Sequence, residues 1–148
     1  MLLAAACSKG GGFKADLKSP DVEKRVRAIE FLGSQRDRSV IPQLIEAVGD
    51  PSTEVRAKSS WALGMLQAKE AMEPVSKLLS DQEARVRQSA ARALLQIEEP
   101  EALPALREAL KVEPDDWVKR DIQEAITHLI QFEGETDVGE GTFKGNWM

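Results

Sequence analysis

Few residues of this chain have side chains suited to catalysis or metal binding, and their spacing matches no known arrangement. The chain has one histidine, His128, and one cysteine, Cys7. A Cys–His nucleophilic pair would need both in one folded site, and a zinc centre needs more such ligands than the chain has. His128 falls beside the apolar stripe of its segment, which favours a surface or rim position. We therefore expect neither a catalytic site nor a metal site.

Two acidic clusters and one glycine run are the other features of the sequence that could bind a ligand. Asp115-Asp116 and Glu98-Glu99-Glu101 could attract a divalent cation but lack the spacing of a calcium loop. Their simpler role is at helix N-termini, where acids are favoured by the helix dipole. Gly10–Gly12 lacks the strand and helix that flank a phosphate-binding loop. The sequence thus predicts a protein that is not an enzyme, with no cofactor and no evident small-molecule substrate.

Length and composition narrow the class of protein further. The chain has 148 residues, 42% hydrophobic and 30% charged, which is typical of one small globular domain or a short repeat array. Its net charge of −5 argues against a nucleic-acid partner, because such proteins are usually basic. No apolar run approaches the roughly 20 residues of a membrane-spanning helix.

The elements that would position any site follow from an internal repeat of about 31 residues. A shift of 31 aligns Ser19-Pro20 with Asp50-Pro51, and Val55-Arg56 with Val86-Arg87. A shift of 32 then reaches Val118-Lys119. The prolines after Ser19 and Asp50 predict that these two residues are helix N-caps.

Each repeat contains a longer and a shorter helical pattern. In the longer one, apolar residues recur at offsets 0, 4, 7, 8 and 11, which is one stripe of an α-helix. Such a helix is marginal alone, so the helix pairs must stack to bury their stripes. In the first repeat Lys24 and Gln35 interrupt the stripe, as the outer face of a terminal repeat requires. The predicted helices are 20–33, 40–48, 52–67, 70–80, 83–98, 101–111 and 115–131.

The segments Asp50–Gly64 and Ala71–Asp81 resemble HEAT repeats of the phycobilisome-lyase-like bacterial type. The resemblance covers about residues 19–131. It implies an all-α fold, a right-handed α-α superhelix of about three helix pairs plus a closing helix, with a concave face that binds a partner. It also implies a ladder in which the Arg after the buried Val pairs with an Asp of a neighbouring turn. The matching residues are Asp50, Arg56, Asp81, Arg87 and Lys119, with Glu113 at the last acidic position.

The two ends of the chain differ from the repeats. Met1–Ser8 resembles the end of a bacterial lipoprotein signal peptide, with Cys7 as the lipidated residue. This predicts a signal remnant and flexible tether over 1–18, a repeat domain over 19–132, and an acidic Gly-rich tail over 133–148. It also predicts a lipid-anchored protein of the cell envelope, on the periplasmic face of a bacterial membrane. The alternative is a cytoplasmic protein with an incidental cysteine.

The tail permits a second interpretation besides flexibility. Its apolar residues Val138, Phe143 and Trp147 are separated by Gly and polar residues, which favours a solvated tail. In the alternative interpretation, these three residues fold back to cover the last helix or contact a partner.

Two tryptophans stand where sister repeats carry charge. Trp61 takes the place of Glu30 and Arg92, and Trp117 that of Glu54 and Arg85. Exposed Trp is enriched in binding hot spots, so both are candidate partner contacts, although each could lie flat across its own repeat. If the shorter helices line the concave face, the further candidates are Gln43, Glu46, Ser76, Lys77, Arg107, Glu108 and Lys111.

These observations favour a non-enzymatic module that binds another protein and is tethered to a membrane through Cys7. The family resemblance supplies an alternative, a component of a phycobilin-lyase-like enzyme that acts on a tetrapyrrole-carrying protein. The two differ in whether the chain binds a bilin.

Overall fold

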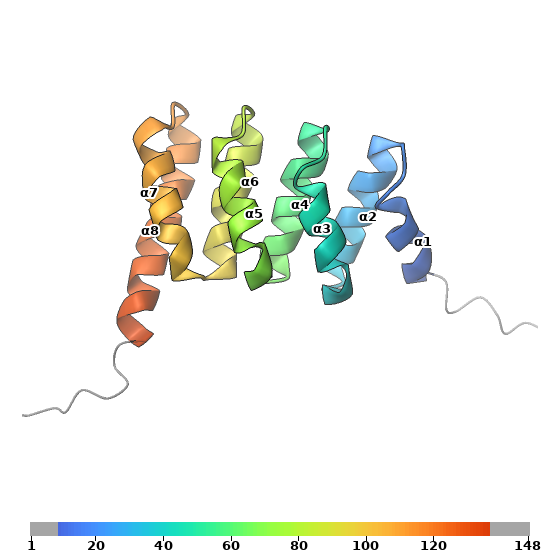
Figure 1. Cartoon of the computed structure of the whole chain (residues 1–148), viewed down its shortest axis with the longest axis horizontal. Coiled ribbons are helices and arrows are strands. Elements are labelled where there is room, and N and C mark those ends of the chain that lie inside the picture. The colour runs from blue at the N-terminus through green and yellow to red at the C-terminus, as the bar shows by residue number, and fades with distance from the viewer. Residues whose placement is uncertain (1–8, 137–148) are drawn as a thin grey trace, which may run out of the picture.

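The computed structural model describes residues 9–136 of the chain, and these residues form a stack of helices without strands. The longer helices lie side by side in one layer and the shorter helices α3, α5 and α7 cover one side of them (Figure 1). This is the predicted α-solenoid. The helices are α1 (Lys9–Asp16), α2 (Val22–Ser34), α3 (Ile41–Ala47), α4 (Thr53–Met65), α5 (Met72–Lys77), α6 (Ala84–Ile97), α7 (Leu103–Val112) and α8 (Asp116–Thr136). Short 3-10 turns flank the shorter helices at Arg38–Val40, Lys69–Ala71, Leu78–Ser80 and Pro100–Ala102.

The apolar stripes of the longer helices form the core, as the repeat pattern predicted. In α4, Val55, Ala62 and Leu63 are fully buried, and the equivalent residues of α6 and α8 are at most 6% exposed. The shorter helices complete the core with residues such as Leu44 and Leu106. The core therefore runs as one continuous layer between the two rows of helices.

The longer helices pack closely because small residues meet between them. A Cβ atom on Gly33 would lie 3.0 Å from the Cβ of Ala62, and one on Gly64 would lie 2.9 Å from the Cα of Ala93. These distances are shorter than van der Waals contact allows, so glycine sets the spacing of α2, α4 and α6.

Most packing between repeats is made by the longer helices. Helix α2 packs on α4, α4 on α6 and α6 on α8, whereas each shorter helix mainly contacts the longer helix that follows it. The longer helices therefore hold neighbouring repeats together, and the shorter helices lie against them on one side (Figure 1). That the shorter helices line the concave face stays a prediction.

The helix N-caps lie two residues beyond the predicted positions. Asp21, not Ser19, caps α2 and accepts the N–H of Glu23 at 2.9 Å, while Ser52, not Asp50, precedes α4. The carboxylate of Asp50 instead accepts the N–H of Ser52 at 2.8 Å. This contact closes a turn ahead of the helix. In sequence, an aspartate before a proline looks the same whether it caps a helix or closes such a turn.

Each longer helix before α8 is followed by a residue with left-handed backbone. Arg36, Gln67 and Glu98 have φ values of 55°, 47° and 58°. Glycine is the usual residue at this position after a helix, because it adopts positive φ without strain. The 31-residue repeat thus includes a turn that is made without glycine.

The ordered stack begins earlier than the tether predicted over 1–18 allows. Helix α1 packs on α2, with the Phe13 ring stacked on that of Phe31 at a centroid distance of 4.2 Å. Leu17 is 7% exposed and lies on the same stripe four residues later. This short stripe covers the first repeat, which explains why a glycine-containing segment is helical there. Cys7 lies outside the described residues.

At the other end, α8 continues to Thr136, beyond the predicted domain boundary at residue 132. The tail residues Val138, Phe143 and Trp147 lie outside the described residues. None of the described helices has the length and apolar character needed to cross a bilayer.

Candidate partner-binding surface

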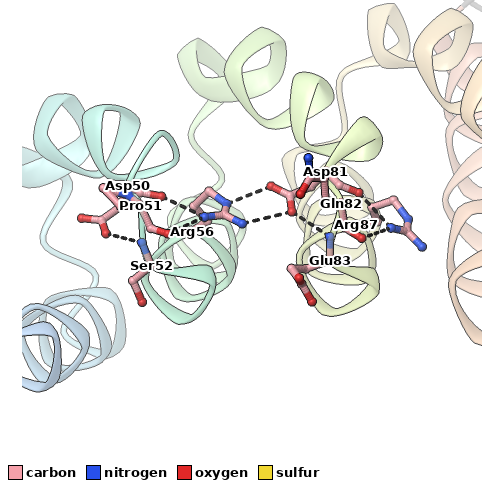
Figure 2. Close-up of polar contacts among 8 residues, drawn as sticks. All are labelled: Asp50, Pro51, Ser52, Arg56, Asp81, Gln82, Glu83 and Arg87. Atoms are coloured by element: carbon pink, nitrogen blue, oxygen red, sulfur yellow. Dashed lines mark hydrogen bonds and ion pairs between the residues drawn. The ribbon is translucent and has the colours of Figure 1, made fainter.

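A ladder of arginine–carboxylate pairs joins successive repeats, and Figure 2 shows its central pair, Arg56 with Asp81. Arg56 of α4 donates from Nε to Asp81 Oδ2 at 2.8 Å and from Nη2 to Oδ1 at 3.2 Å. Its Nη1 donates to the carbonyl of Asp50 at 3.0 Å, within the turn ahead of its own helix. Asp81 in turn accepts the N–H of Glu83 at 3.0 Å. Each carboxylate therefore closes the turn before one helix and receives the guanidinium of the preceding repeat.

The same arrangement occurs at both neighbouring joints. Arg25 Nη2 donates to Asp50 at 3.1 Å, and Nε lies 3.0 Å from the other carboxylate oxygen without pointing at it. Arg87 donates to both oxygens of Glu113, at 2.7 and 2.9 Å. Among the proposed ladder residues, Lys119 alone makes no such contact, because it pairs with Asp116 on its own helix at 3.1 Å. The family pattern missed Arg25, although the 31-residue shift aligns it with Arg56.

The ladder changes the pKa of its carboxyl groups. Burial, the largest single influence, would raise the pKa of Asp81 and of Glu113. The guanidinium hydrogen bonds and the backbone N–H donors outweigh burial, so the pKa of each lies below its usual value. Both carboxylates are therefore charged at neutral pH, and the ladder is structural rather than an acid–base site.

The candidate partner contacts fall on two opposite sides of the stack. Trp61 of α4 and Trp117 of α8 belong to the layer of longer helices. The other candidates lie on α3, α5 and α7, so the structure does not bring the full set together. These are Gln43, Lys77, Arg107 and Lys111.

Trp117 is an exposed aromatic residue at the start of the last helix. Its side chain is 63% exposed, and the guanidinium carbon of Arg120 lies 4.2 Å from its ring centre. An arginine stacked on one face of the ring restricts its motion and leaves other parts of the ring exposed. An exposed, oriented tryptophan of this kind is suited to protein contacts.

Trp61 is half-buried. It is neither a fully exposed partner contact nor a ring lying flat across its own repeat. Its ring edge lies over Gly33, where a Cβ atom would approach Cζ3 to 3.2 Å. It therefore leans across the preceding repeat. Trp61 also lines an open hollow of about 440 Å³ between α4 and α6, so part of the ring faces solvent.

His128, the single histidine, contacts a carboxylate at the rim of the stack. The Nε2 atom of His128 lies 2.9 Å from Glu98 Oε1, a contact that joins α8 to the end of α6. No group of three or more His, Cys, Asp or Glu residues within 9–136 is placed to hold a metal ion. His128 thus lies on the rim, as predicted.

Comparison with known families agrees with the architecture. The family described as HEAT repeats matches residues 13–73 and 48–127. No curated protein matches the chain.

Solved structures of several kinds share the fold. The complex of CpcE and CpcF of phycocyanin lyase from Nostoc sp. PCC7120 matches with a TM-score of 0.74 and 23% identity, over 93% of this chain and 59% of the other. Human deoxyhypusine hydroxylase in complex with glycerol matches with a TM-score of 0.70 and 25% identity, over 95% and 49%. A designed armadillo repeat protein in complex with the peptide (KR)4 matches with a TM-score of 0.59 and 21% identity, over 84% and 70%. This chain spans about half to three fifths of the length of the first two.

Proposed function

Since the chain belongs to the family of HEAT-repeat proteins, we propose that it is a non-enzymatic module that binds another protein. The partner contacts the exposed side of the longer helices α2, α4, α6 and α8. A rigid stack presents these helix faces already ordered, so that little entropy is lost on binding.

The exposed Trp117 with Arg120 stacked on it is the observation that carries this proposal. Large exposed aromatic residues are unfavourable in water and are common at the centres of protein interfaces. Likeness to a complex of two lyase subunits and to a designed repeat protein with bound peptide supports a macromolecular partner.

A binding assay with matched variants tests the proposal. Trp117→Ala should weaken capture of the partner by cross-linking in the native membrane fraction, while the thermal melt followed by circular dichroism stays the same. Val112→Ala is the control, because Val112 is 80% exposed on α7 and also loses apolar surface. If no specific protein is captured by the unmutated chain, the proposal fails.

We further propose that the module is held at a membrane, on the periplasmic face of a bacterial envelope, by lipid on Cys7. The resemblance of Met1–Ser8 to a lipoprotein signal supports it. More than one acyl chain gives firm anchoring, since a single chain holds only marginally. Labelled palmitate should enter the full-length native gene product and be lost with Cys7→Ser. Absence of label in the unmutated protein would leave a cytoplasmic module.

A second candidate function is a component of a phycobilin-lyase-like enzyme. The match to the phycocyanin lyase complex supports it at the level of the fold. A shift in the visible absorbance of a bilin on mixing with the protein would favour this function, and an unchanged spectrum would exclude it.

A further inference from the structure

The joints on either side of the centre of the stack are each crossed by an ion pair between longer helices. At the α2–α4 joint, Lys58 donates to Glu30. At the α6–α8 joint, Arg92 Nε donates to Asp121 Oδ2 at 2.8 Å. The two pairs occupy equivalent positions of the repeat with their charges reversed. An ion pair of either polarity therefore closes this position at both joints.

At the middle joint, between α4 and α6, the equivalent position holds no ion pair, although Arg85 of α6 lies 3.9 Å from Glu54 of α4 elsewhere in the joint. A shift of 31 residues places Trp61 and Ser89 at the two positions that form the ion pair in the preceding joint. Ser89 Oγ donates to the carbonyl of Ala57 at 2.6 Å and is thus held against α4. The middle joint therefore opens into the hollow of about 440 Å³, with Trp61 on its wall.

The lining of this hollow is cationic. Its longer polar side chains are Lys58, Arg85, Gln88, Arg92 and Gln96, and no described residue that lines it is acidic. Arg85 and Arg92 are 60% and 62% exposed. The nearest contact of Arg85 with a carboxylate is 3.9 Å, to Glu54 outside the hollow, which is too long for a hydrogen bond. Lys58 and Arg92 already contact Glu30 and Asp121 outside the hollow, the latter through Nε of Arg92. The guanidinium of Arg85 and the Nη groups of Arg92 are therefore the donors left for a carboxylate from another molecule.

We propose that this hollow, which we call the middle-joint site, recognises an acidic segment of the protein partner. Carboxylates of the segment bind Arg85 and Arg92, and an apolar side chain lies against Trp61. Gln88 and Gln96 both line the hollow from α6, where their amides reach the backbone of an extended peptide. The inference rests on the proposed function and adds the chemistry of the partner.

Tryptophan fluorescence tests the middle-joint site directly. In a chain with Trp117→Phe and Trp147→Phe, Trp61 is the remaining tryptophan. Titration with a short acetylated poly-glutamate peptide should change its emission to saturation, whereas poly-lysine of equal length should not. Because the attraction is between charges, added salt should weaken the poly-glutamate complex.

Charge reversal in the same background identifies the surface. Arg85→Glu should weaken poly-glutamate binding about ten-fold or more. Lys24→Glu makes the same change in net charge at an exposed position of α2, away from the hollow. It should leave the affinity for poly-glutamate unchanged. Far-UV circular dichroism of both variants checks that the fold is kept.

The outcomes separate this inference from the proposed function. Absence of poly-glutamate binding, or equal weakening by Arg85→Glu and Lys24→Glu, overturns the middle-joint site. If Trp117→Ala still weakens partner capture in that case, the module binds its partner elsewhere on the longer helices. If the unmutated chain captures no specific protein, the proposed function itself is contradicted.

Discussion

The guanidinium of Arg87 holds the carboxylate of Glu113 through two hydrogen bonds, from Nε at 2.7 Å and from Nη2 at 2.9 Å. The side chains are 12% and 2% exposed, so both charges are largely removed from water. Glu113 also accepts the N–H of Asp115 at 3.0 Å and closes the turn ahead of α8. One contact therefore fixes both the position of the last helix and the local turn that begins it.

Removing one member of this pair should be costly. Arg87→Ala leaves the buried carboxylate of Glu113 without its partner, so we expect the free energy of unfolding to fall by about 3 kcal/mol. Lys119→Ala, which breaks an exposed pair on a single helix, should change it by less than about 0.5 kcal/mol. Urea unfolding of the two variants measures the difference. Equal effects would contradict a structural role for the ladder.

The ladder also predicts how stability depends on pH. The pKa values of Asp81 and Glu113 lie below their ordinary values of 3.8 and 4.5 in the folded chain. The unfolded chain therefore binds protons first as the pH falls. The stability from these carboxylates is complete above about pH 5 and is lost as the pH falls through the folded-state pKa values.

Substitution of one carboxyl group isolates this effect. Glu113→Gln should be less stable than the unmutated chain at neutral pH and should lose less further stability on acidification. Urea unfolding at a series of pH values follows both. Parallel curves for the two proteins would show that Glu113 does not contribute to the acid sensitivity.

The close approach of α4 to α6 predicts a strict requirement for glycine. Gly64→Ala places a Cβ atom 2.9 Å from the Cα of Ala93, so the helices must separate, at a cost of about 1–3 kcal/mol. Gly49→Ala is the control, because its nearest neighbour is the Glu46 carbonyl oxygen at an ordinary 3.5 Å. Thermal melts compare the two, and a fully tolerated Gly64→Ala would mean that the helices are farther apart than described.

The left-handed turn after α4 offers a stabilising substitution. Gln67→Gly removes the strain of a side chain at φ 47° and should raise the free energy of unfolding by about 0.5–1 kcal/mol. Gln35→Gly, at a right-handed position with φ −76°, should give no gain. Urea unfolding measures both, and a loss of stability with Gln67→Gly would argue against the left-handed turn.

The fold could be predicted because the repeat specifies it several times. The stripe that begins at Val55 recurs at Val86 and Val118, and stacking is the way for all of these stripes to leave water. Some local features were not predicted from the sequence, in one case because the same residue type has two structural roles. Asp50 resembled a helix N-cap but closes the turn before the helix and binds Arg25. The first helix was missed because Phe13 and Leu17 provide only one turn of apolar stripe.

The candidate surface was less accessible to sequence reasoning. The substitution of Trp61 for a charged residue was visible, but the hollow beside it depends on Ser89 from the next repeat. The repeat alone did not indicate which row of helices binds a partner, because its candidate residues fall on both rows, Trp61 and Trp117 on the longer helices and the rest on the shorter ones. The glycines at Gly33 and Gly64 mark the close approach of the longer helices.

Site-specific photo-cross-linking tests most directly whether the longer helices bind the partner. Glu124 on α8 and Glu108 on α7 are both exposed glutamates, on the longer and shorter helices respectively, so a photo-reactive residue at either position probes one side. We predict that position 124 captures a protein that excess unlabelled chain displaces, and that position 108 captures none. Displaceable capture from position 108 alone would contradict the account.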